Sequence, residues 1–370
     1  MYLLEFAGED DGLALAEART AVEAGAPLGP GLARARSIDR QRVLGLAFTR
    51  RASELVGHAA PTLEDVRVLL DAATIDRTGS VAVRARDVRG TTGIDTLAVE
   101  RALGDVLVDR GFTVDLEAPD HVLRAVFTAG PRPADRPGRP DAGTNGRTAG
   151  EVDGVSDGER NGEADGERTE DVALGVLGWL TVESRRDFGP RAPTEKPFFQ
   201  PGSMDPLLAR AVANLAGAGP DVTLLDPMCG TAGLLIEGGL VGASVVGLDA
   251  QRKMVAGARR NLRTYLEEPA AWQVIRGDAT ALPLRADAVD GVVFDAPYGR
   301  QSPSPRHERM DLITGALAEA HRVAPRGVVV ADEPLSAACV DAGWSVRARF
   351  ERYVHRSLTR HLHVLSRADA

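Results

Sequence analysis

The sequence predicts a two-part protein, in which an α+β unit precedes a doubly wound α/β sheet with mostly parallel strands and an antiparallel edge. Short alternating strands and amphipathic helices share the N-terminal part. From Val222 onward strands and helices alternate, and the chain closes with two strand-like stretches in succession. Between these parts, residues 131–170 hold eight Gly, four Pro, ten acidic and six Arg residues. That segment cannot bury enough apolar surface to offset chain ordering, so we predict a disordered insertion.

The N-terminal part begins with a strand and helix from "MYLLEFA" onward. A helix then leads through a turn at Thr78–Ser80 to an alternating strand that starts at Val81, and "IDTLAVERALGDVLVDRGF" predicts an amphipathic helix that Gly111 stops. Strand-like text flanks the insertion on both sides ("HVLRAVFT" and "VALGVLGWLTVES"). We therefore expect the insertion to interrupt one domain, and each half of the chain to have its own core.

The C-terminal part contains five apolar strands that alternate with helices, namely "VTLLD", "SVVGLD", "WQVIR", "GVVFD" and "GVVVA". A final pair, "WSVRARFERYV" and "HLHVLSRA", supplies the antiparallel edge. Ligands of such sheets bind beyond the carboxyl ends of the strands. Aspartates stand at several of these ends, so the chemistry is expected there.

Composition excludes several classes of protein. The 370 residues carry a net charge of −9, and only two of the 44 basic residues, Lys196 and Lys253, are lysines. This acidic, lysine-poor balance predicts a halophilic protein that requires or tolerates molar salt, although a GC-rich genome alone also replaces lysine with arginine. Neither a bilayer-spanning run nor a basic leader is evident, so we expect a cytoplasmic protein without membrane contact. Two cysteines and seven histidines without ligand spacing predict no metal site.

The strand ends indicate an adenosine cofactor. After Asp226, a turn that contains Gly230 and Gly233 opens a helix, so the backbone can approach a ligand closely. The turn matches neither GxGxxG nor a P-loop. Asp249 is placed to bind a ribose diol, and Asp278 to accept from an adenine amine. With no phosphate to neutralise, the pattern favours S-adenosyl-L-methionine, although any single aspartate after a strand is more often a turn former.

The stretch "VVFDAPYGR" carries the candidate chemistry, because a buried strand stops abruptly at Asp295. An exocyclic base nitrogen is a poor nucleophile, since its lone pair is delocalised into the ring. The carboxylate of Asp295 and the carbonyl of Ala296 can each accept one N–H and orient that nitrogen toward a methyl donor. Pro297 forms the turn, and Tyr298 is placed to stack on the extruded base.

These motifs resemble those of amino-methyltransferases that act on bases, in which "DPMCGTAG" matches the methyl-donor loop and "DAPYG" the [DN]PP[YF] motif. Ala296 departs from the usual proline, which puts the rigidity of the loop in doubt. The linker "RRDFGPRAPTEKPFFQPGSMDPLLARAVANLAGAG" resembles that of archaeal THUMP-domain tRNA (guanine(10)-N2)-methyltransferases. The N-terminal strands likewise resemble a ferredoxin-like plus THUMP module.

The resemblance implies a class I, Rossmann-like methyltransferase domain at 203–370, a linker at 185–202 and a THUMP RNA-binding region at 1–184. From the residues alone, we expect Ser203 to cap the helix that begins this domain. The resemblance also implies that "PFFQPGS" lines the cofactor pocket, although its phenylalanines are also suited to packing under the sheet. The residues expected to bind the cofactor are Phe199, Ser203, Asp226, Pro227, Gly230, Thr231, Gly233, Asp249, Asp278 and Ala279.

The implied partner is tRNA, held mainly by shape and phosphate contacts, and the implied protein is a monomer. The arginines expected to meet RNA are Arg84, Arg86, Arg185, Arg186, Arg356 and Arg360. The last two are equally readable as surface edge charges. Methylation of another guanosine or of adenine N6 uses the same catalytic motif, and a catalytically silent RNA-binding protein is the alternative of another class. The number of methyl groups added stays open.

Overall fold

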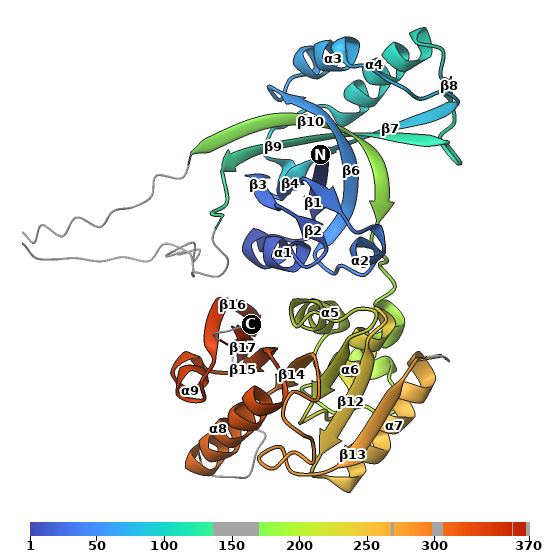
Figure 1. Ribbon diagram of the computed structural model, residues 1–370. Helices are drawn as coiled ribbons and strands as arrows, with labels where there is room; N and C mark the ends of the chain where they lie inside the picture. The colour runs from blue at the N-terminus through green and yellow to red at the C-terminus, as the bar shows by residue number, and fades with distance from the viewer. Residues whose placement is uncertain (136–169, 268–269, 298–305, 357, 368–370) are drawn as a thin grey trace, which may run out of the picture.

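The computed structural model describes residues 1–135, 170–267, 270–297, 306–356 and 358–367. Two large sheets organise these residues, one in each half of the chain (Figure 1). The eight-stranded N-terminal sheet has the order β3-β4-β1-β6-β10-β9-β7-β8, and the seven-stranded C-terminal sheet has the order β13-β12-β11-β14-β15-β17-β16. No described helix is long and apolar enough to cross a membrane.

The N-terminal part follows the predicted order of elements. Its strands are β1 (Tyr2–Phe6), β2 (Val22–Glu23), β3 (Ala26–Gly29), β4 (Leu32–Ala35), β5 (Ser37–Ile38), β6 (Thr49–Ala59), β7 (Ser80–Asp87), β8 (Thr113–Val114), β9 (His121–Pro131) and β10 (Asp171–Glu183). Its α-helices are α1 (Asp11–Ala18), α2 (Arg40–Leu44), α3 (Leu63–Ala72) and α4 (Thr96–Asp109). Gly79 has a φ of 108° in the turn before β7, a conformation that suits glycine.

One long sheet joins what the sequence suggested were two modules. Strand β6 pairs with β1 through residues 49–54 and, on its other edge, with β10 through residues 51–59. Strands β9 and β10 pair with each other from Asp171 opposite Pro131 to Trp179 opposite Leu123. The insertion therefore connects two adjacent strands of one sheet. Of the segment 131–170 that was predicted to be disordered, Pro131 instead ends β9, and residues 136–169 lie outside the described residues.

The C-terminal part is a mostly parallel sheet with an antiparallel edge, as predicted. Its strands are β11 (Thr223–Asp226), β12 (Ser244–Asp249), β13 (Trp272–Arg276), β14 (Gly291–Asp295), β15 (Arg326–Ala331), β16 (Ser345–His355) and β17 (Leu358–Ser366). Helices α5 (Pro206–Leu215), α6 (Gly233–Leu240) and α7 (Arg252–Tyr265) pack on one face, and α8 (Arg306–Val323) and α9 (Ser336–Asp341) on the other. Only β17 runs antiparallel to β15, with β16 beside it.

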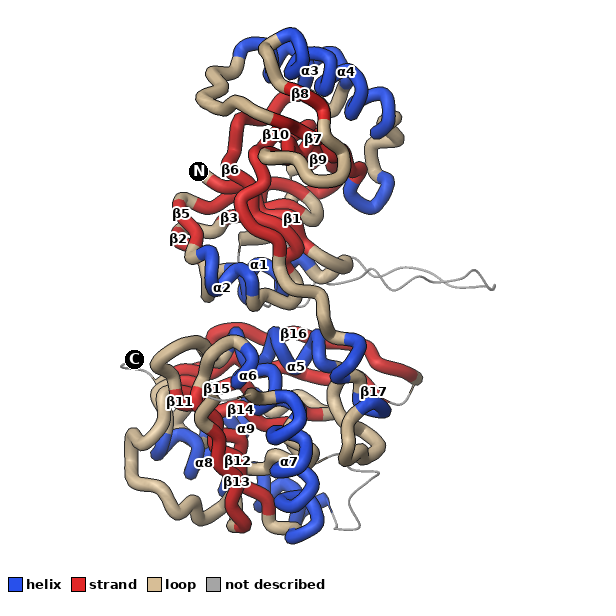
Figure 2. Tube along the Cα trace, turned by 90° about the vertical axis from the view of Figure 1, so that its right-hand side faces the viewer, coloured by secondary structure: helices blue, strands red, loops and turns tan. Residues whose placement is uncertain are grey.

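Each half has buried clusters of its own, as expected, but a further cluster extends across the boundary between the halves. Leu13 of α1 and Phe48 belong to the same buried cluster as Leu208 and Val212 of α5. Both views place α1 and α2 beside α5, whereas α3 and α4 lie at the far end of the molecule (Figure 2). An amphipathic sequence pattern does not show which partner an apolar face covers.

Candidate active site

A cavity of about 430 Å³ lies at the carboxyl ends of the central strands. Its lining combines the turn after β11, the end of β12, the loop after β13, the end of β14 and the linker before α5. Predicted residues in the lining are Ser203, Asp226, Pro227, Gly230, Thr231, Gly233, Asp249, Asp278, Ala279, Asp295, Ala296 and Pro297. Sequence reasoning therefore placed these side chains at one edge of the sheet, because parallel strands end together.

The lining also contains residues that sequence analysis did not single out. They are Gln200, Pro201, Gly202, Met204, Met228, Cys229, Leu234, Ala250, Gln251, Met254 and Leu312. The three methionines provide apolar, adaptable walls suited to a purine ring. Burial raises the pKa of the Cys229 thiol well above its usual range, so this thiol stays protonated and is a poor nucleophile.

The turn after β11 is held by hydrogen bonds to the strand ends. The backbone amide of Met228 donates to Asp226 Oδ1 at 3.0 Å, and that of Gly230 donates to Asp249 Oδ2 at 3.1 Å. Gly230 and Ala232 have φ values of 50° and 63°. A left-handed alanine is costly, so these contacts must hold the turn in place. The result is a tight loop that leads into α6 with its backbone at the cavity wall.

Carboxylates dominate the charge of the lining. Asp226 is almost fully buried, and burial raises its pKa well above the usual value, with the nearby carboxylates of Asp249 and Asp295 acting in the same direction. Asp278 is exposed, and hydrogen bonds from the Thr280 amide and hydroxyl lower its pKa. Asp278 thus forms a turn and lines the cavity at once. Such a lining suits a ligand that carries positive charge.

The candidate catalytic strand end lies where the motif predicted. Asp295 ends β14, and the Ala296 amide continues the ladder by donating to the Val330 carbonyl at 2.8 Å. Arg360 of β17 places Nη2 3.9 Å from Asp295 Oδ2 and donates to the Gly202 carbonyl at 3.1 Å. Tyr298, predicted to stack on the base, lies outside the described residues.

Arg360 is therefore a correction to the sequence analysis, which placed it at the surface to meet phosphates or as an edge charge. It is 4% exposed and reaches from β17 to both the catalytic strand end and the linker. The sequence around Arg360 gave no signal that this side chain is buried. Arg360 thus contacts Asp295 from β17 and helps to position its carboxylate in the site.

The linker segment lies against the cavity, but its residues differ in role from the expectations. Asp205 caps α5 by accepting from the Leu207 amide, so the prediction that Ser203 is the cap is wrong. Pro206 at the first helical position was the overlooked signal, since proline favours that place. Ser203 Oγ instead lies 3.2 Å from Thr231 Oγ1 inside the cavity lining. Phe199 is 41% exposed and does not contribute to the described lining.

Phe198, the neighbour of Phe199, carries the packing role. Asn261 of α7 exchanges hydrogen bonds of 2.8 Å with both the amide and the carbonyl of Phe198. A Cβ on Gly257 would lie 2.0 Å from the Phe198 ring, so only glycine admits the ring at this point of α7. This contact fixes the linker over the helix.

Comparison with known proteins decides which family these features belong to. Residues 193–361 match a family model described as the RMKL-like methyltransferase domain. The chain is 33% identical over 328 residues to the tRNA (guanine(10)-N2)-dimethyltransferase of Methanothermobacter thermautotrophicus, covering 87% of this chain and 83% of that protein. The chain belongs to the tRNA (guanine(10)-N2)-dimethyltransferase family. This is the family that the linker and the motifs resembled.

A second relative of the tRNA (guanine(10)-N2)-dimethyltransferase family comes from Methanocaldococcus jannaschii. It is 26% identical over 320 residues, with 84% of this chain and 77% of the relative covered. Among solved structures, TrmN from Thermus thermophilus is 21% identical, has a TM-score of 0.48 and aligns over 99% of both chains.

The remaining arginines predicted to bind tRNA in this family member are distributed over three regions, namely β7, the linker and the turn between β16 and β17. Arg185 and Arg356 are exposed, the latter in the hairpin turn between β16 and β17. Arg84 donates to the Leu116 carbonyl at 2.7 Å, and Arg86 lies 3.6 Å from the buried Glu5. Arg186 donates to the Ala47 carbonyl and lies over the Phe188 ring. Arg84, Arg86 and Arg186 thus have structural partners, and RNA contact by any of the five stays a prediction.

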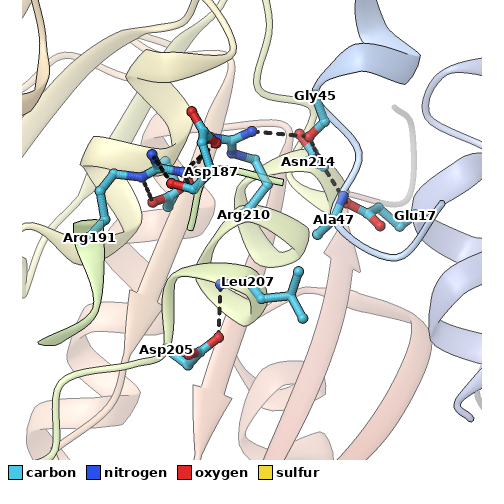
Figure 3. Close-up of polar contacts among 10 residues, drawn as sticks. Glu17, Gly45, Ala47, Asp187, Arg191, Asp205, Leu207, Arg210 and Asn214 are labelled. Carbon is cyan, nitrogen blue, oxygen red and sulfur yellow. Dashed lines mark hydrogen bonds and ion pairs between the residues drawn. The ribbon is translucent and has the colours of Figure 1, made fainter. Parts of the chain in front are cut away.

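The joint between the two halves contains a polar network beside the shared core (Figure 3). Glu17 of α1 accepts from the amides of Ala47 and Phe48, both at 2.7 Å, and from Asn214 Nδ2 of α5 at 2.6 Å. Next to it, Arg210 of α5 pairs with Glu237 at 2.7 Å. The network fixes α5 against the N-terminal half.

Proposed function

We propose that this chain transfers a methyl group from S-adenosyl-L-methionine to the exocyclic N2 of guanosine at position 10 of tRNA. The observation that carries the proposal is the convergence of Asp295 and Ala296 with the glycine-containing turn on one cavity. Family membership supplies the substrate, since both relatives named above are tRNA (guanine(10)-N2)-dimethyltransferases. Their names favour two successive transfers, the second to the same nitrogen.

The cavity fits the cofactor through charge and shape. S-adenosyl-L-methionine carries a sulfonium and an ammonium group, and Asp226, Asp249 and Asp295 surround the cavity with carboxylates. Asp249 already orders the turn, and its position at the end of β12 suits the ribose diol. When bound, the cofactor supplies an electrophilic methyl group.

The residues of this chain orient the nucleophile. Asp295 accepts one N–H of the guanine amino group and the Ala296 carbonyl accepts the other, which directs the nitrogen lone pair at the methyl carbon. With the cofactor bound, formation of the N–C bond would break the C–S bond of the sulfonium and release S-adenosyl-L-homocysteine, and the Asp295 carboxylate would accept the proton that the cationic nitrogen loses. Arg360 contacts both Asp295 and the linker at Gly202. Tyr298, which lies outside the described residues, stays the predicted stacking partner of the base.

The N-terminal half presents the tRNA to this cavity. Its long sheet and the helices α3 and α4 form the THUMP region, which recognises folded RNA by shape and backbone contacts. Since the joint between the halves is buried, we propose that it fixes the distance between the THUMP region that binds the tRNA and the cavity in which the base is methylated.

The decisive experiment incubates the purified full chain with labelled methyl donor and unmodified tRNA transcripts, then maps the product by mass spectrometry. We expect N2-methylguanosine and N2,N2-dimethylguanosine at position 10, and no incorporation into a matched transcript with adenosine at that position. Methyl transfer to adenine N6 or to another guanosine contradicts the assignment of position. A chain that binds tRNA but transfers no methyl group supports the silent RNA-binding alternative.

A further inference from the structure

Lys196, one of only two lysines in the chain, is buried in the linker beside the cavity. It is 6% exposed and directly follows the short 3-10 helix Pro193–Glu195 of the linker. Its ammonium group points at the first turn of α6, since a Cβ on Gly233 would lie 3.1 Å from Nζ. The other lysine, Lys253 of α7, is exposed and lies over the Phe198 ring.

The surroundings of Lys196 leave its charge without a direct partner among the described residues. The carboxylates whose negative charge raises the pKa of Lys196 are those of Glu237 and Asp205. Glu237 is occupied by Arg191 and Arg210, both at 2.7 Å, and Asp205 caps α5 (Figure 3). Burial accordingly lowers the pKa of Lys196. A desolvated ammonium without a counter-ion is costly, so its retention calls for an anion that the polypeptide does not supply.

The start of α6 also lacks an anionic partner from the polypeptide. Ala232 precedes the helix, and no side chain caps its first amides. The positive end of the helix dipole also disfavours a lysine there, because cations are stabilised at the opposite end. Gly233 and Leu234, which carry two of the first amides, line the cavity. The uncapped helix start lines the cavity, and the buried ammonium of Lys196, which is not itself a lining residue, lies against that helix start at Gly233.

We propose that Lys196 and the first turn of α6 bind the carboxylate of the methionine part of S-adenosyl-L-methionine. Every ionisable carboxyl group in the described lining is an aspartate, from Asp226, Asp249, Asp278 and Asp295. These groups suit the sulfonium and ammonium of the cofactor and repel its carboxylate. The cofactor carboxylate is instead stabilised by the ammonium group of Lys196 and the first backbone amides of α6. The inference rests on the proposed cofactor and adds a residue for its recognition.

The test compares two ligands that differ by the carboxylate alone. Calorimetry measures binding of S-adenosyl-L-homocysteine and of its decarboxylated analogue, S-adenosyl-3-thiopropylamine, to the full chain. A charge-assisted hydrogen bond contributes 1.5–3 kcal/mol, so we expect the wild-type chain to bind the analogue roughly 10-fold to 100-fold more weakly. Lys196→Met should lose that preference, because it weakens S-adenosyl-L-homocysteine by a similar factor and leaves the analogue nearly unchanged. Lys253→Met, the matched control, should keep the wild-type preference.

The outcomes separate the inference from the function on which it rests. If the wild-type chain binds neither ligand, the cofactor assignment fails. If Lys196→Met keeps the preference, or weakens both ligands by the same factor, the inference is wrong and Lys196 is structural.

An amine-reactivity measurement on the wild-type chain covers the case of a variant that does not fold. With only two lysines, mass spectrometry resolves the labelling of Lys196 from that of Lys253. S-adenosyl-L-homocysteine should slow the labelling of Lys196 at least about tenfold and the decarboxylated analogue much less, since the ion pair keeps the amine protonated. Equal protection by both ligands contradicts the inference.

Discussion

The joint and the cavity each bury a carboxylate, and their surroundings differ in kind. Glu17 at the joint accepts three hydrogen bonds, and Arg210 adds a favourable charge. Asp226 in the cavity accepts one hydrogen bond, from Met228, and its charged neighbours are Asp249 and Asp295. Burial raises the pKa of both groups. One site is saturated by the polypeptide, whereas the other is left to be completed by a ligand.

The difference teaches how to separate structural from functional polar groups in this fold. Buried polar groups in proteins are normally paired within the chain. Where a cavity wall carries groups that the chain does not satisfy, the ligand supplies the missing charge or hydrogen bond. Each variant below probes one side of this contrast.

The largest expected effect is at the catalytic strand end. Asp295→Ala removes one preorganised acceptor at the reacting nitrogen, so methyl transfer should fall roughly 10²-fold to 10³-fold. Affinity for S-adenosyl-L-homocysteine should stay within a few-fold of wild type. Single-turnover transfer to tRNA and calorimetry measure the two effects. Normal turnover in this variant would show that Asp295 only ends the strand.

A buried histidine away from the cavity gives a pH-dependent effect on stability. Burial lowers the pKa of His363 to about 4, and its Nε2 accepts from the Leu335 amide. Since the unfolded value is near 6.5, this stability is complete above pH 6.5 and is lost as pH falls toward 4, amounting to about 3 kcal/mol.

The matched variants for this pH dependence are His363→Gln and, as control, His307→Gln at an exposed position on α8. Urea unfolding between pH 7 and pH 4.5 measures the slope. The control should keep the wild-type slope, and His363→Gln should flatten it. Equal slopes in all three proteins would assign the acid sensitivity to other groups.

A variant of Arg360 tests whether turnover depends on the contacts of this arginine with Asp295 and the linker. Arg360→Met removes the contacts to Asp295 and Gly202 while filling the space. We expect turnover to fall about tenfold, which corresponds to 1.4 kcal/mol, with a smaller loss of cofactor affinity. Arg360→Lys should recover part of the rate. A variant that loses tRNA affinity alone would restore the original assignment to phosphate contact.

The smallest effect is expected from shortening the insertion. The backbone amide of Arg132 donates to the Glu170 carbonyl at 2.9 Å. The ends of the segment are therefore close together, and a short turn can bridge them. Deleting residues 136–169 should raise stability by at most about 2 kcal/mol, because closure entropy grows only with the logarithm of loop length, and should leave turnover unchanged. Melting temperature and turnover test this. A large loss of tRNA affinity would assign a binding role to the segment.

The sequence predicted the parts of the site that depend on local order. Asp226, Asp249 and Asp295 each end a strand, and parallel strands end at the same edge, so their convergence followed from the pattern alone. Lys196 and Arg360 gave no such signal, because their burial depends on how the linker and β17 pack. Shared burial of Leu13 and Leu208 was equally invisible, since an amphipathic face does not name its partner.

The most direct measurement of the central contrast applies one isosteric change at both carboxylates at pH 8. Glu17→Gln replaces one acceptor oxygen with an NH2 group, so at least one of the donors that face Glu17 loses its acceptor. The unfolding free energy should therefore fall by about 1–3 kcal/mol, with cofactor affinity unchanged. Asp226→Asn removes a buried charge beside other carboxylates, so the ligand-free protein should become more stable while S-adenosyl-L-methionine binds roughly tenfold more weakly. These opposite signs are the predicted result. Loss of stability in Asp226→Asn together with unchanged cofactor affinity would contradict the account.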